Sequence, residues 1–487
     1  MKKTTLGLFL VVAMLLVGAM PASMQGAGSM STAFAVQNLS ASEVAHVMAA
    51  FYNTEGTRTA ELSEDVAAGA NFNFDQRYDT GDPGTEPFQG SAIVSADQPI
   101  GAAANMMRTG GAVPAYESYN ALSADAVGQD LLLPQILRNV SSAGLIYNTT
   151  IVIQNTDTQN AAAVQVVFNP DPVVNAQIGG TLTTPFTYTA NIAAGGSVYI
   201  DQANTPTAAQ IGERFFGSAR VLVTNGIDVA PVVYNDGGGQ VLFALPAFAA
   251  GTTDSIYLPS VYKEIASLGD SYSTAFLIVN FGDADATVEI EYLPIVGTAA
   301  AVKDVVTVPA KAGLNVDQRY VAGITSATFF GAAVIKSTNA QPIAAFVNLR
   351  GGARYGMTYG GLMAGATTAA YLPIAYKDVA SGGYSWSSTI VVSNMGDTDA
   401  RVKFTFYPSG AAAIADAAEY TITAAEGVEQ FDLRYTTAIG AGGASAQERF
   451  IGAVKVEVVA GTAGVMVQTR GAGGSGDSLM AFQALTP

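Results

Sequence analysis

STAFLIVNFGDADATVEIEYLP, residues 273–294, contains the pattern that decides the fold. Its first eight positions read as an alternating strand, a Gly- and Asp-rich break follows Asn280, and alternation resumes at Val288, Ile290 and Tyr292. A period of two is typical of a β-strand with one buried face. The stretch therefore predicts an antiparallel hairpin of two half-buried strands.

The same pattern occurs four times along the 487 residues. Each copy has an asparagine at the end of its first strand, and these are Asn38, Asn155, Asn280 and Asn394, spaced by 117, 125 and 114 residues. Copies two to four also open with a Leu-Pro strand, as in YLPSVYK at 257–263. Roughly seven strands per copy match an immunoglobulin-like antiparallel β-sandwich. The predicted fold class is all-β, with four tandem sandwiches after a signal peptide.

The expected boundaries follow from these signals. Lys2 and Lys3 precede an apolar run from Leu6 to Val17, which is too short to span a bilayer and is typical of a secretory signal. We expect a signal peptide at 1–27 and sandwich repeats at 28–124, 125–250, 251–365 and 366–487. The linkers are short, so the sequence predicts separately cored modules in a row. The mature chain is expected to be secreted or at the cell surface, without a transmembrane segment.

Composition excludes several function classes. The chain has no cysteine, which removes disulfides, iron-sulfur clusters and zinc-thiolate sites. A formal charge of −17 opposes nucleic-acid binding, which depends on Lys and Arg. His46 is the only histidine and is expected to face outward on its strand, so a Ser-His-Asp triad has no histidine to use. We therefore expect a protein that is not an enzyme.

Paired carboxylates follow glycine in two of the turns. They are Asp283 with Asp285, and Asp397 with Asp399. Clustered Asp oxygens suit Ca²⁺, whereas a plain Gly-Asp turn uses Asp because its side chain bonds the local backbone. Both alternatives stay open, and calcium is the one cofactor that the sequence suggests.

A second motif, DQRY or DLRY, recurs near the middle of the repeats. It gives the binding-site candidates Asp75, Arg77, Tyr78, Asp317, Arg319, Tyr320, Asp432, Arg434 and Tyr435, while the second copy stops after Asp201-Gln202. In a structural role, Asp and Arg would fix a strand end and Tyr would pack on the sandwich edge. In a functional role, the motif would be a contact patch present in several repeats.

The order of YLP-x-x-YK, alternating strand, Asn, Gly-Asp turn, DQRY, FGSA and QPIAA resembles the tandem immunoglobulin-like repeats of bacterial secreted and cell-envelope proteins of the surface-layer, sheath or adhesin type. The resemblance covers nearly all of the chain after the signal peptide. It implies an extracellular structural or adhesive role, with further copies of the chain or other envelope proteins as partners. A carbohydrate- or matrix-binding array is the first alternative, and it should expose ring-stacking aromatic residues on one face in several copies. A carboxylate-based hydrolase is the second, and it needs two carboxyl groups facing each other across a cleft.

The first repeat lacks a Leu-Pro strand of its own, which predicts an unpaired sheet edge, with closure of that edge by the stretch from Gln25 to Ser31 as the alternative. A strand from another protomer, supplied by residues 478–487, would fill such an edge by β-augmentation. Repetition of that contact would build a filament, sheath or lattice.

Overall fold

The computed structural model describes residues 10–14, 29–75, 88–109, 113–204, 210–267, 270–295, 301–363, 368–424, 427–439, 449–474, 476 and 478–486. Strand accounts for 64% and helix for 4% of the chain, so the all-β prediction is confirmed. The described residues form eight antiparallel sheets. None of the helices in these ranges is long and apolar enough to cross a membrane.

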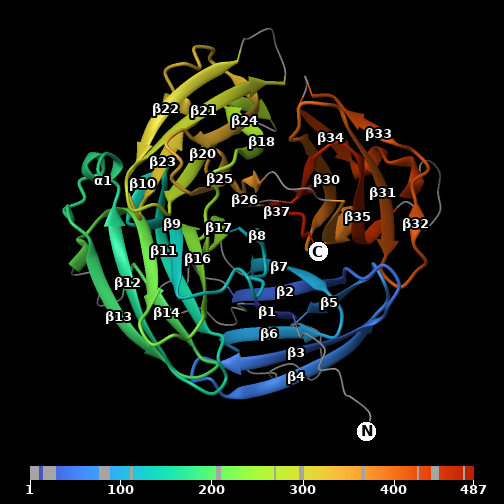
Figure 1. Ribbon diagram of the computed structural model, residues 1–487, viewed down its shortest axis with the longest axis horizontal. Coiled ribbons are helices and arrows are strands. Elements are labelled where there is room, and N and C mark those ends of the chain that lie inside the picture. Colours follow the sequence, from blue (N-terminus) through green and yellow to red (C-terminus); the bar gives the residue numbers. More distant parts are fainter. Residues whose placement is uncertain are drawn as a thin grey trace.

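Four of the sheets lie on the outside of the molecule (Figure 1). The first outer sheet has the spatial order β1 (Leu10–Met14), β6 (Gly90–Ala96), β3 (Ala45–Asn53) and β4 (Arg58–Val66), and the second has the order β9 (Asp130–Arg138), β15 (Phe215–Val223), β12 (Ala162–Pro170) and β13 (Phe186–Ile192). The third has the order β27 (Leu362–Met363), β18 (Ile256–Lys263), β24 (Phe329–Ser337), β21 (Ala286–Pro294) and β22 (Val302–Val308). The fourth has the order β28 (Ala369–Lys377), β35 (Phe450–Ala460) and β31 (Ala400–Pro408), and β31 pairs with both β32 (Ile414–Ala415) and β33 (Tyr420–Ile422).

The other four sheets lie on the inside. They consist of β5 (Asn71–Asp75), β2 (Ser29–Asn38), β7 (Ile100–Thr109) and β8 (Ala115–Asn120); of β10 (Val140–Ser142), β11 (Leu145–Asn155), β16 (Val229–Gly237) and β17 (Val241–Pro246), with β14 (Ser197–Asp201) on β11; of β19 (Ile265–Ser267), β20 (Asp270–Asn280), β25 (Ile343–Gly351) and β26 (Tyr355–Gly360), with β23 (Gly313–Asp317) on β20; and of β29 (Val379–Ser381), β30 (Tyr384–Asn394), β36 (Ala463–Ala472) and β37 (Leu479–Gln483), with β34 (Val428–Asp432) on β30. The helical elements named within the described ranges are α1 (Val174–Gln177), η2 (Gln318–Tyr320), η3 (Leu433–Tyr435) and η4 (Thr437–Ile439).

The predicted hairpin at 273–294 is wrong, because β20 belongs to an inner sheet and β21 to an outer one. The turn between them is a corner that carries the chain across the sandwich. Asn280 holds this corner: its Nδ2 donates to the carbonyl oxygens of Ala284 at 2.8 Å and Val308 at 3.0 Å, and its Oδ1 accepts from Gly282 N–H at 2.8 Å. Asn38, Asn155 and Asn394 make the same kinds of bond in their repeats. The buried amide satisfies backbone groups that the corner leaves outside any ladder.

The outer strands bury one face, as their sequences predict. Buried and partly exposed residues alternate along β12 and β21, and Val288, Ile290 and Tyr292 face the core of the third repeat. The inner strands differ, because both of their faces are buried. Leu277 and Phe346 of the third repeat pack into the core of the second. The expectation of half-buried strands is therefore wrong for the inner sheets, whose near-continuous apolar runs are typical of two-sided burial.

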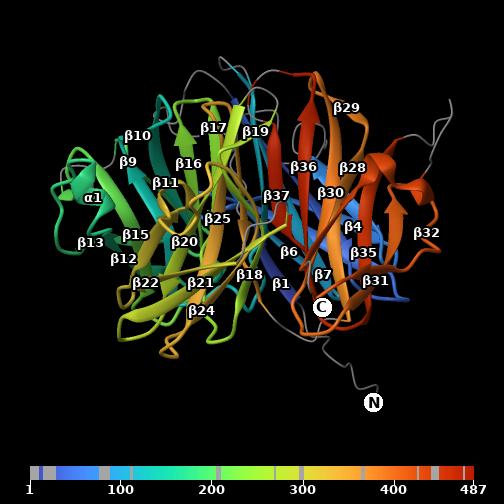
Figure 2. The same ribbon diagram turned by 90° about the horizontal axis from the view of Figure 1, so that it is seen from above.

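Each inner sheet covers the core of the preceding repeat, and the series closes on itself (Figure 1). The core of the first repeat includes Val232 and Tyr234 of the second, the core of the third includes Met466 of the fourth, and the core of the fourth includes Ala35 and Ala103 of the first. The strands β8, β17, β26 and β37 contact one another around the common axis. Figure 2 shows the same ring from the side. The expected row of separately cored modules is wrong, because the interfaces are continuous with the cores.

Both chain ends depart from the sequence-based expectations. The C-terminal strand β37 pairs with β36 of its own repeat, from Met466↔Gln483 to Arg470↔Leu479, so this segment is not a free donor for another protomer. At the other end β1 pairs with β6, from Leu10↔Ala96 to Met14↔Ala92. The strands β9, β18 and β28 take the equivalent place beside β15, β24 and β35. A strand from within the predicted signal peptide thus fills the edge that the first repeat was expected to leave open.

The Leu-Pro strands β9, β18 and β28 interrupt their ladders at the proline. The register of β9 on β15 shifts between Leu133↔Ala219 and Ile136↔Gly217, around Pro134. Similar shifts surround Pro259 in β18 and Pro373 in β28. Proline has no N–H to donate, so a bulge at this place costs no ladder bond.

Candidate functional site

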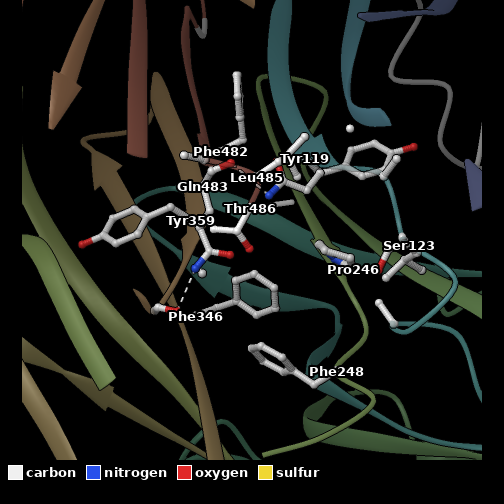
Figure 3. A pocket seen from close by; sticks show the side chains of 18 of the residues that line it. Tyr119, Ser123, Pro246, Phe248, Phe346, Tyr359, Phe482, Gln483, Leu485 and Thr486 are labelled. Carbon is white, nitrogen blue, oxygen red and sulfur yellow. Dashed lines mark hydrogen bonds between the residues drawn. The ribbon is translucent and has the colours of Figure 1, made fainter. Parts of the chain in front are cut away.

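A cavity of about 540 Å³ lies where the four repeats meet on the axis. Its walls are mainly apolar, and the rings of Phe248 and Phe346 lie with their centroids 4.5 Å apart (Figure 3). Gln483 Nε2 donates to Gly361 O at 2.7 Å, and Asn120 Nδ2 donates to Gln483 O at 3.0 Å. Asp125 is the one charged side chain in the described lining. The cavity suits a small uncharged apolar molecule. Its walls come from all four repeats, so it forms where the ring closes, and no motif in the sequence predicts it.

The DQRY motif forms a short turn after β23. Asp317 Oδ1 accepts from Arg319 N–H at 3.0 Å, and Arg319 Nη2 lies 2.6 Å from Asp317 Oδ2. The Arg319 guanidinium lies 5.3 Å from the centroid of the Tyr320 ring, and Tyr320 is 78% exposed. The hydrogen bond to Asp317 raises the pKa of Arg319, so this arginine stays charged. Asp and Arg fix the strand end as the structural alternative expected, but the tyrosine does not pack on the sandwich edge.

The fourth repeat has the same turn after β34. Arg434 Nη2 lies 2.5 Å from Asp432 Oδ2, its guanidinium lies 5.5 Å from the centroid of the Tyr435 ring, and Tyr435 is 77% exposed. Both turns start from the same register, with Ala275 opposite Asp317 and Thr389 opposite Asp432. The two exposed rings therefore occupy equivalent places on the ring of repeats.

The first two repeats differ at this turn. Asp75 ends β5 opposite Ala33, in the same register, while Arg77 and Tyr78 lie outside the described residues. In the second repeat Asp201 Oδ1 accepts from Ala203 N–H at 2.9 Å, so the aspartate still bonds the backbone of the turn. Ala203 and Asn204 stand there in place of the arginine and tyrosine of the motif. The aspartate that ends the strand is thus present in all four repeats, whereas the exposed tyrosine that follows it is missing from the second.

A groove of about 780 Å³ between the second and third repeats begins at the DQRY turn. Tyr320 and Arg319 lie on the side of the third repeat, and Tyr147 and Phe243 lie on the side of the second. Between them Arg350 Nη2 donates to Ser142 O at 2.7 Å, and its guanidinium lies 5.0 Å from the centroid of the Tyr147 ring. Burial lowers the pKa of Arg350. Sequence reasoning missed Arg350, although its Arg-Gly step recurs as Arg470-Gly471.

The calcium candidates lie at the inner-to-outer corners. Lys311 Nζ lies 3.1 Å from Asp283 Oδ1, and Asp285 Oδ1 accepts from Ala310 N–H at 3.1 Å. In the fourth repeat Asp399 Oδ1 accepts from Ala424 N–H at 3.1 Å, and Asp397 precedes it in the same turn. Within the described ranges, no three His, Cys, Asp or Glu side chains come together to hold a metal ion. Calcium binding at these corners stays a prediction.

His46 faces outward, as expected, with 65% of its side chain exposed. Its Nδ1 lies 2.6 Å from Asp65 Oδ1, and this hydrogen bond raises the pKa of His46. Opposite charges on Asp65 and Asp97 add to the effect. The residue therefore belongs to a surface cluster on β3 and β4.

No known protein family matches the chain, and no curated protein or solved structure is significantly similar to it.

Proposed function

We propose that this protein is a secreted, non-catalytic adhesive protein that binds polysaccharide through its Asp-x-Arg-Tyr turns. The observation that carries the proposal is the exposure of Tyr320 and Tyr435, at 78% and 77%. No other large aromatic side chain within the described ranges is exposed to this degree. A large exposed apolar ring is informative when it recurs at equivalent places, because a folded chain otherwise buries such rings.

The ion pair between Asp317 and Arg319 supports a binding role for the Tyr320 ring. Three side-chain hydrogen bonds join Arg319 to Asp317, and the guanidinium lies beside the Tyr320 ring, so the ring has a fixed neighbour on one side. Tyrosine provides a large amphipathic contact at low entropic cost, which is why it is common in recognition surfaces. A sugar ring with its apolar C–H face and its hydroxyl groups matches a tyrosine whose hydroxyl stays in water.

Two rings on one rigid scaffold also support binding to a polymer. Residues of the third and fourth repeats pack in one common core, so the turns of these two repeats are held at a fixed separation. When one polymer occupies both sites, the second contact forms at a high effective concentration. Weak stacking at each tyrosine is then sufficient for adhesion.

We further propose that the eight sheets are four immunoglobulin-like sandwiches that correspond to the repeats at 28–124, 125–250, 251–365 and 366–487, with β1 (Leu10–Met14) added to the first. The strand orders β4-β3-β6-β1, β13-β12-β15-β9 and β22-β21-β24-β18 match one another and support this assignment. A structural role through self-association is a second proposal. It is favoured by β6, because among the described residues β1 is the strand that covers its edge, and removal of residues 1–27 would take β1 away.

The test is sedimentation of the purified protein with insoluble polysaccharides, followed by titration with soluble fragments of those that bind. We expect Tyr320→Ala and Tyr435→Ala each to weaken binding about tenfold, equivalent to about 1.4 kcal/mol, and the double variant to lose it. Val305→Ala is the matched control, because Val305 is also apolar and 59% exposed but lies on β22, the edge strand of an outer sheet. Wild-type binding by the double variant would contradict the proposal.

A further inference from the structure

Two inner-sheet arginines, Arg350 and Arg470, form no ion pair with a carboxylate in the part of the chain that the structure describes. Asp236, Arg350 and Arg470 occupy the same position in their repeats. Each lies opposite the residue that precedes the corner asparagine, Asn155, Asn280 or Asn394, by the same number of positions. Arg350 Nε and Nη2 donate to the carbonyl oxygens of Gly352 at 3.1 Å and Ser142 at 2.7 Å, and its remaining bond goes to the Ser142 hydroxyl. No ion pair joins Arg350 or Arg470 to another described residue. Arg350 does lie within reach of the charges of Asp317 and Arg319, which oppose each other and pair in the turn.

Arg470 repeats the surroundings of Arg350. Arg470 lies near Tyr272, as Arg350 lies near Tyr147. Burial raises the pKa of Tyr272, and the positive charge of Arg470 opposes that rise. The Nε of Arg470 is buried without a hydrogen-bond partner among the described residues. A partly buried cation without a counter-charge is costly, and an anion that neutralises it recovers much of that cost.

The second repeat shows how the fold neutralises this position when no ligand is needed. There Asp236 replaces the arginine, and its Oδ2 lies 2.7 Å from Nη1 of Arg108 in the neighbouring repeat. The same repeat lacks the exposed tyrosine of the turn. Within the second, third and fourth repeats, an unpaired arginine and an exposed tyrosine thus occur together or are both missing.

We infer that Arg350 and Arg470 each bind the carboxylate of an acidic sugar, so that the ligand of this protein is a polyuronic acid. The inference rests on the polysaccharide binding proposed above. A guanidinium presents parallel N–H donors that match a carboxylate, and its charge strengthens both bonds. The groove of about 780 Å³ contains both Arg350 and Tyr320, so one ligand can contact the cation and the exposed ring.

The other charges around the groove leave this role to Arg350. Asp317 and Arg319 neutralise each other in the turn. The carboxylate of Glu264 accepts from Ser271 Oγ at 2.5 Å and lies on the exposed rim. Recognition of an anion by a chain of net charge −17 therefore depends on this local cation, and the affinity is expected to fall as salt screens it.

The test is calorimetry with tetragalacturonate, the neutral maltotetraose and sodium acetate, at low and high salt. We expect the wild type to bind tetragalacturonate at least tenfold more tightly than maltotetraose, with weaker binding at high salt. The variant Arg350→Met/Arg470→Met should lose this preference and keep its affinity for maltotetraose. Arg401→Met is the control, because Arg401 pairs with Glu419 on an outer sheet.

The outcomes separate this inference from the proposed function. If maltotetraose binds as tightly as tetragalacturonate and the double methionine variant behaves like the wild type, the inference is overturned and polysaccharide binding stands. If neither oligosaccharide binds, both fail. Competition by acetate at concentrations equal to tetragalacturonate would assign a general anion site and overturn the sugar ligand. Thermal unfolding with and without tetragalacturonate gives a second measurement, since only a protein that binds it is stabilised.

Discussion

Replacing Asp236 by asparagine tests whether the ring depends on its shared interior. Arg108 is 1% exposed at its side chain and Asp236 is 10% exposed, so solvent screens their interaction very little. Nε and Nη2 of Arg108 have no hydrogen-bond partner among the described residues, which leaves the Asp236 carboxylate as its neutralising group. Removal of one member of a buried pair costs about 3–5 kcal/mol. We expect Asp236→Asn to lower the free energy of unfolding by about this amount.

The assay is urea unfolding followed by circular dichroism, with Glu289→Gln as the control. Glu289 pairs with Lys303 at 2.8 Å, but their side chains are 37% and 55% exposed, and such a surface pair contributes under about 1 kcal/mol. The double variant Arg108→Met/Asp236→Leu should recover most of the loss, because it leaves no buried charge unpaired. A loss below about 1 kcal/mol for Asp236→Asn would refute the idea that the first two repeats are joined through a common core.

Three further predictions follow from the interfaces and edges. Trp386 packs against Tyr116 at 4.7 Å between ring centroids, so Tyr116→Ala should shift tryptophan emission to longer wavelength, and unchanged emission would argue against closure between the first and fourth repeats. Arg220 lowers the pKa of Asp130, so Asp130→Asn should be less stable than the wild type at neutral pH, and the difference should shrink as pH falls below about 4, the ordinary pKa of Asp, in thermal unfolding at several pH values. Removal of residues 1–27 should speed hydrogen exchange of the amides in β6, because it takes away β1, which pairs with β6 along that edge, and equal protection would contradict the β1–β6 pairing.

The sequence predicted the all-β class and the outer strands well because these depend on local pattern. Alternation at Val288, Ile290 and Tyr292 places one face inward whatever the neighbours are. The same reasoning failed at Asn280, where a short polar break was interpreted as a hairpin although it crosses between sheets. Turn residues specify a local bend, while the choice of sheet depends on partners far along the chain.

The candidate site was predicted in part for the same reason. The Asp-x-Arg-Tyr turn is local, and its recurrence pointed to Tyr320 and Tyr435. Arg350 was not predicted, because its neighbours Ser142 and Tyr147 are 208 and 203 positions away in the chain.

The sequence by itself predicted the all-β class, the alternating outer strands and a unit that recurs four times, because these depend on residues close together in the chain. Only the tertiary structure decided that the inner sheets are covered on both faces, that the fourth repeat closes on the first, and that a cavity and a groove lie between repeats. The physical reason is that small apolar residues such as Ala35 and Ala103 serve equally well in a thin single core and at a close contact between sheets. Burial of their second face depends on surfaces brought together only when the whole chain has folded.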